Sequence, residues 1–177
     1  MDPKIRIKSI QSIQRILSAF LILIGMASCS PRLFSYEGQT VGEENRIPLK
    51  EGSHQEQWKT GDLALNYAYR KKGDDFEITG TVVFDKHLRY NYRSLTTFFL
   101  RAYFIDSAGK IVDEQVLSSG SYLQDVEDMY FKRSLILIPD VVAVAFGYTG
   151  HAQEQSGGGI LGQHDSIDWD FWKSPVR

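Results

Sequence analysis

The feature that most limits the possible folds is an alternation of apolar and polar residues that begins at residue 63. Leu63, Leu65, Tyr67 and Tyr69 alternate with small or polar residues, and residues 76–84 repeat the pattern. Successive side chains of a β-strand point to opposite faces, so this period of two predicts half-buried strands. Similar runs cover residues 95–106, 111–117, 130–138 and 141–148, and the polar stretches 85–94 and 118–129 are predicted to connect them.

These six runs, without a long amphipathic helical pattern, predict an all-β protein. We expect an immunoglobulin-like antiparallel β-sandwich of about seven strands, with a small open β-barrel as the alternative. The expectation concerns architecture alone, because the chain has one cysteine and lacks the cysteine pair of antibody domains. Gly80 indicates a bulge or a point of close packing. The link Pro139-Asp140 fits either a hairpin or a corner between sheets.

Composition divides the rest of the chain around a sandwich core at residues 61–150. Residues 29–60 are polar and are interpreted as a tether, although residues 47–60 are able to supply a weak strand. Residues 151–177 form a Gly-rich C-terminal tail that contains Trp169, Phe171 and Trp172. Large aromatic side chains are costly to leave in water, so we expect this tail to pack on the domain or to bind a ligand.

The N-terminus has the organisation of a secretory signal. Four basic residues precede residue 16, and residues 16–27 are twelve residues without a charge. A basic region followed by an apolar stretch of about 7–15 residues and a small residue is typical of a signal peptide. The stretch is too short for a spanning helix, which needs about 20 apolar residues.

Residues Met26-Ala27-Ser28-Cys29 resemble the lipobox of bacterial lipoproteins. The resemblance covers residues 1–29 and implies removal of residues 1–28 and lipidation of Cys29. Several acyl chains hold a protein firmly to a membrane. Ser30 follows the cysteine where an inner-membrane lipoprotein commonly has Asp, so the implied location is the cell envelope, anchored by lipid in the outer membrane and facing the periplasm. A plain signal peptide and an uncleaved anchor are the alternatives.

Charge and cysteine content exclude several classes. The net charge is −2, and removal of residues 1–28 leaves 16 basic and 21 acidic residues, a net charge of −5. Nucleic-acid binding needs a basic surface, so we expect no nucleic-acid partner. The single cysteine rules out an intramolecular disulfide and a multi-cysteine zinc site.

Motifs that carry catalysis are weak. No serine lies in a Gly-x-Ser-x-Gly elbow, and residues 156–159 lack the Lys-Ser/Thr of a phosphate-binding loop. Metal-ligating residue types gather near the C-terminus without zinc or calcium spacing, so we expect no metal, no cofactor and no enzyme. These residues are His151, His164, Asp165, Asp168 and Asp170.

Two features instead indicate binding. A basic and aromatic cluster lies in the predicted loop, and loops at the end of a sandwich commonly carry binding surfaces. Its candidate residues are Lys86, His87, Arg89, Tyr90, Tyr92 and Arg93. The alternative is that the tyrosines extend a strand whose edge the basic residues keep soluble. Trp169 and Trp172 are the second candidates, since tryptophans stack on sugar rings when they are not in the core.

We therefore expect a cell-envelope lipoprotein whose β-sandwich is a non-enzymatic binding or assembly module, with the membrane and an envelope protein as partners. An envelope glycan-binding module is the alternative. A metal-dependent hydrolase that uses His151 and His164 is a third, weaker hypothesis.

Overall fold

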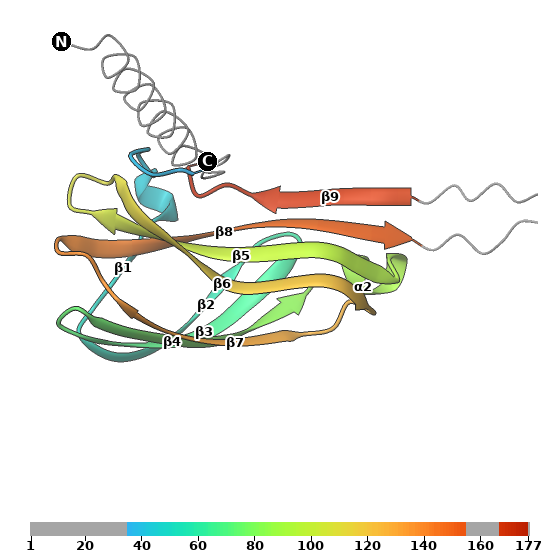
Figure 1. Cartoon of the computed structure of the whole chain (residues 1–177), viewed down its shortest axis with the longest axis horizontal. Helices are drawn as coiled ribbons and strands as arrows, with labels where there is room; N and C mark the ends of the chain where they lie inside the picture. The colour runs from blue at the N-terminus through green and yellow to red at the C-terminus, as the bar shows by residue number, and fades with distance from the viewer. Residues whose placement is uncertain (1–34, 155–166, 177) are drawn as a thin grey trace, which may run out of the picture. The chain divides into compact units, whose positions relative to one another are not determined.

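A computed structural model describes residues 35–154 and 167–176, which form two antiparallel β-sheets (Figure 1). The larger sheet has the order β1 (Ile47–Pro48), β8 (Val141–Glu154), β5 (Ser94–Asp106) and β6 (Ile111–Gln124), and β9 (Ile167–Lys173) also pairs with β8. The smaller sheet has the order β2 (Gly52–Lys59), β3 (Leu63–Lys72), β4 (Asp75–Phe84) and β7 (Met129–Ile136). The described helices are a 3-10 turn, η1 (Glu43–Asn45), and α2 (Lys86–Asn91).

The prediction of an all-β, immunoglobulin-like antiparallel sandwich is confirmed as an architecture. Two separate sheets pack face to face and do not close into a barrel. The described residues form nine strands, against the expected number of about seven. The additional strands β1, β2 and β9 come from segments that flank the predicted core at residues 61–150.

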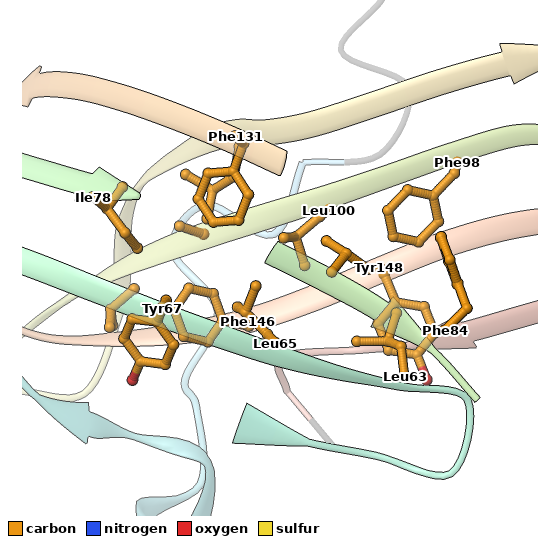
Figure 2. Packing of buried hydrophobic residues seen from close by; sticks show 14 of the residues in the cluster. Leu63, Leu65, Tyr67, Ile78, Phe84, Phe98, Leu100, Phe131, Phe146 and Tyr148 are labelled. Carbon is orange, nitrogen blue, oxygen red and sulfur yellow. The ribbon is translucent and has the colours of Figure 1, made fainter. Parts of the chain in front are cut away.

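Alternation along the strands builds the core between the sheets. Leu65 and Tyr67 of β3 point from the smaller sheet toward Phe146 of β8 (Figure 2). The Tyr67 and Phe146 rings meet edge to face with centroids 5.1 Å apart, and Phe84 meets Phe98 in the same way at 5.0 Å. Such pairs are favourable beyond the apolar area they bury. These two aromatic pairs therefore join the two sheets across the core.

The predicted tether over residues 29–60 enters the fold earlier than its composition indicates. β2 pairs with β3 from Gly52 to Lys59 as an edge strand of the smaller sheet. Most of its side chains are exposed, and the half-buried Trp58 contacts Phe146 and Tyr148. An edge strand that packs one large side chain against the core needs few apolar positions, which explains the polar composition of residues 52–59.

Two connections differ from the simplest expectation. β6 continues through residues 118–124, which were expected to be a polar connection. The sequence of this part is polar because the far end of the edge strand is largely accessible to solvent. β7 and β8 belong to different sheets, so the Pro139-Asp140 link crosses between the sheets and is not a hairpin. Asp140 takes a positive φ of 72°, a conformation that Asp tolerates better than most residues.

A second, smaller apolar cluster lies on the outer face of the larger sheet. Tyr36 and Val176 cover part of that face from the two ends of the described chain. The backbone N–H of Val41 donates to the Gly109 carbonyl at 2.9 Å, which fixes the N-terminal segment beside the start of β6. The buried members of this outer cluster are Val41, Tyr103, Ile105, Ile111, Ala143 and Ala145.

Candidate binding surface

The segment predicted as a polar loop contains the helix α2, which corrects both the loop and the strand-extension alternative. The Asp85 side chain accepts a hydrogen bond from the His87 backbone N–H at 3.1 Å and caps the helix. Leu88 is fully buried and fixes one side of the helix to the core. A helix of six residues is too short to show a 3.6-residue period, so its only sequence signal was the capping residue.

His87 ties α2 to the rest of the domain. Its Nδ1 lies 3.0 Å from Asp85 Oδ1, and its Nε2 lies 3.4 Å from Asp62 Oδ1 in the β2–β3 turn. Asp62 also accepts a hydrogen bond from the Tyr148 hydroxyl at 2.6 Å, and Thr60 Oγ1 lies 3.0 Å from that hydroxyl. The imidazole therefore belongs to a polar network that joins α2, the β2–β3 turn and β8.

The electrostatics of this network favour a fixed arrangement. The hydrogen bonds from the His87 backbone N–H and side chain hold the pKa of Asp85 below its ordinary value. Burial, with the hydrogen bond to Asp62, raises the pKa of Tyr148 well above its ordinary value. The Asp85 carboxyl is thus ionised and the Tyr148 phenol is neutral at pH 7. This network could not be predicted from the sequence, because Asp62 and Tyr148 lie 86 positions apart.

Two more of the predicted binding residues have structural contacts. Arg89 donates through Nε to the Phe84 carbonyl at 3.0 Å and pairs with Asp128 in the β6–β7 connection. Tyr92 is half-buried and packs against the main core. Together with His87, these side chains hold α2 in place.

Three of the predicted binding residues are exposed. Lys86 and Arg93 are exposed, and Tyr90 is 81% exposed on the side of α2 opposite Leu88. The backbone N–H of Arg93 donates to the Gln153 carbonyl of β8 at 3.2 Å. The helix therefore presents a cation and an aromatic ring from a rigid base.

Trp169 and Trp172 lie on opposite faces of β9. Trp169 pairs with Ala152 and Trp172 with Thr149, which places Trp169 on the side of the sheet that faces the core. Their exposures are 46% and 69%. Phe171, which lies between them in the sequence, is buried against Tyr148 and Phe98. The tail therefore packs on the domain through Phe171, while both tryptophans remain accessible.

The structure divides the predicted binding residues between two places. Ser94, Gln153 and Asp168 are neighbours across β5, β8 and β9, so the end of α2 and the start of β9 lie at the same end of the sandwich (Figure 1). Trp172 lies further along β9 on the outer face. We name the first group the helix-end surface: Lys86, Tyr90, Arg93 and Trp169.

The histidine and acid cluster of the tail is only partly described. His151 Nδ1 lies 2.7 Å from Asp170 Oδ1, and Nε2 lies 3.9 Å from Asp168 Oδ2. No group of three His, Cys, Asp or Glu side chains in residues 35–154 and 167–176 is arranged to hold a metal ion. Cys29, His164, Asp165 and the glycine tract 156–159 lie outside the described residues.

Comparisons with known proteins add no family to this geometry. No protein-family model matches the sequence, and no curated protein matches it. Within the described part of the chain, no helix has the length and hydropathy that crossing a bilayer requires.

Proposed function

We propose that this protein is a cell-envelope lipoprotein, anchored through a lipid on Cys29, whose sandwich is a non-enzymatic binding or assembly module. The basic and apolar segment 4–27 and the lipobox-like residues before Cys29 support the anchor. Ser30 supports the outer membrane, with the domain facing the periplasm. The acidic net charge of the mature chain argues against nucleic acid as a partner.

The observation that carries the binding role is the rigid presentation of Tyr90. The ring is 81% exposed, yet its helix is held by the cap at Asp85 and by the contacts of His87 and Arg89. Because the helix backbone is already held, covering Tyr90 orders only its side chain, and tyrosine is enriched where binding energy concentrates. Lys86 and Arg93 nearby favour a partner surface with acidic groups.

The test is site-specific photo-crosslinking in cells that make the full-length, lipidated protein. A photoreactive phenylalanine replaces Tyr90. In the matched control the same phenylalanine replaces Tyr130, which is 69% exposed on β7 of the smaller sheet. We expect position 90 to capture one envelope protein that position 130 does not. Adding Lys86→Glu and Arg93→Glu should reduce this capture at least tenfold. Equal capture at both positions, or capture that survives the charge reversal, contradicts the proposal.

A glycan-binding module is the second candidate, because two tryptophans of one strand are accessible. Its test is sedimentation of the domain with purified peptidoglycan. Three results together would favour this candidate: position 90 captures no protein, the domain sediments with peptidoglycan, and Trp169→Ala or Trp172→Ala abolishes that sedimentation.

A further inference from the structure

The described chain begins on one particular face of the domain. The Tyr36 ring packs edge to face on Tyr103, with ring centroids 5.6 Å apart. Tyr103 belongs to the apolar cluster on the outer face of the larger sheet. The Gly38 backbone N–H donates to the Ile111 carbonyl at 2.8 Å, so the segment is attached there within two residues of Tyr36. Any anchor upstream of Tyr36 is therefore connected to this face.

The connection to the anchor is short. Seven residue steps separate Cys29 from Tyr36, and a fully extended chain covers at most about 25 Å in that number. A strand of fourteen residues, such as β8, is about 45 Å long. With a lipid on Cys29, the distance from Tyr36 to the bilayer is therefore shorter than the length of a strand such as β8. The face from which the tether leaves has the shortest path to the lipid.

The same face exposes large apolar side chains. Trp172 of β9 is 69% exposed, and Phe99 of β5 is 38% exposed. Both lie opposite Thr149 of β8, one on each side, so their Cα atoms are about 10 Å apart. Phe99 and Tyr103 are four positions apart on β5 and share the outer face, which places the pair beside the cluster that Tyr36 covers.

The charged side chains described on this face carry no basic excess. The Arg101 guanidinium lies 5.8 Å from the centre of the Phe99 ring and pairs with Glu114 at 3.1 Å. Asp168 and Asp170 lie beside His151 at the far end of β9. Because the mature chain is also acidic overall, an anionic lipid surface would repel it. Tryptophan and tyrosine are the side chains that favour the interface between headgroups and acyl chains.

We propose that the outer face of the larger sheet lies on the membrane, with Trp172 and Phe99 in the interfacial layer of a zwitterionic lipid surface. This inference rests on the proposed lipid anchor. It leaves the helix-end surface, at the other end of the sheet from Tyr36, free to meet a partner.

The test compares two single substitutions in the full-length lipidated protein, reconstituted in phosphatidylcholine vesicles that contain brominated acyl chains. Trp169→Phe leaves Trp58 and Trp172, and Trp172→Phe leaves Trp58 and Trp169. Brominated lipid quenches only nearby tryptophans, and the half-buried Trp58 is the same background in both proteins. We expect quenching of the Trp169→Phe protein to be at least twice that of the Trp172→Phe protein.

A second variant checks the role of the tether. Twenty Gly and Ser residues are inserted before Tyr36 in the Trp169→Phe protein, which lengthens the connection between Cys29 and the domain. The quenching of Trp172 should decrease, because the effective concentration of the outer face at the bilayer falls. Equal quenching of the two tryptophan variants, or none, overturns the inference and leaves the face available to another partner. The intact mass reports lipidation separately, so a missing lipid identifies failure of the anchor instead.

Discussion

At the scale of single residues, Asp85 shows how one carboxylate helps to set the position of the helix α2. Its side chain caps α2 and contacts the His87 ring, and these hydrogen bonds lower its pKa. A carboxyl whose pKa is lower in the folded state stabilises the fold above its unfolded pKa and loses that contribution as the pH falls through the folded value. The contribution is therefore complete at pH 7, begins to fall near the unfolded pKa of about 4 and is lost only below the lower, folded pKa.

Substitution of Asp85 should separate capping from charge. We expect Asp85→Ala to lower the urea midpoint at pH 7, because the cap is lost, whereas Asp85→Asn keeps a good cap that does not titrate. The decrease of the midpoint between pH 5 and pH 3 should be smaller for Asp85→Asn than for the unchanged protein. Urea titrations followed by circular dichroism measure both effects. An alanine variant as stable as the asparagine variant would show that the cap has no role.

At the scale of elements, β9 is attached to the sandwich by one side of its strand. Phe171 is buried under the core face, while Trp172 points to the outer face. We expect Phe171→Ala to destabilise the fold by about 3–5 kcal/mol, the usual cost of emptying a buried phenylalanine site. Trp172→Ala, one position away and exposed, should change stability by less than about 0.5 kcal/mol. Chemical denaturation measures both, and equal losses would contradict the assigned faces.

Strands with one strongly apolar face were predictable from the sequence, including the edge strands β6 and β7, whereas the polar edge strand β2 was expected only as a weak strand. The alternation of Leu63, Leu65, Tyr67 and Tyr69 located β3, because each apolar side chain enters the core. Gly80 was predicted as a bulge or a close-packing point, and it is the latter: an added Cβ would lie 2.8 Å from the Phe131 ring. β2 has a polar sequence because it is an edge strand, so its pairing with β3 depends on backbone hydrogen bonds that no side-chain pattern reveals.

The candidate site was predictable in its residue types but not in its geometry. The cluster 86–93 was recognised from its basic and aromatic composition, and Lys86 and Tyr90 are indeed exposed. His87 and Arg89 could not be assigned structural roles, since their partners Asp62 and Asp128 are distant in the sequence. The opposite faces of Trp169 and Trp172 follow from their odd spacing on β9, once that segment is known to be a strand.

At the scale of the whole molecule, we propose separate roles for two surfaces of the domain. The outer face of the larger sheet, where Tyr36 attaches, is assigned to the membrane, and the helix-end surface is assigned to a partner. The membrane assignment depends on a short connection to a lipid on Cys29, because the anchor is what would hold one face of the domain close to the bilayer.

Mass spectrometry of the protein purified from the membranes of cells that make the full chain tests this dependence most directly. We predict an N-terminal peptide that begins at Cys29 and carries a diacylglycerol and an acylated amino group. A Cys29→Ser protein, made in parallel, should retain residues 1–28 and lack the lipid. Recovery of the unchanged chain with an unmodified Cys29 thiol, or of a chain cut elsewhere, would contradict the account.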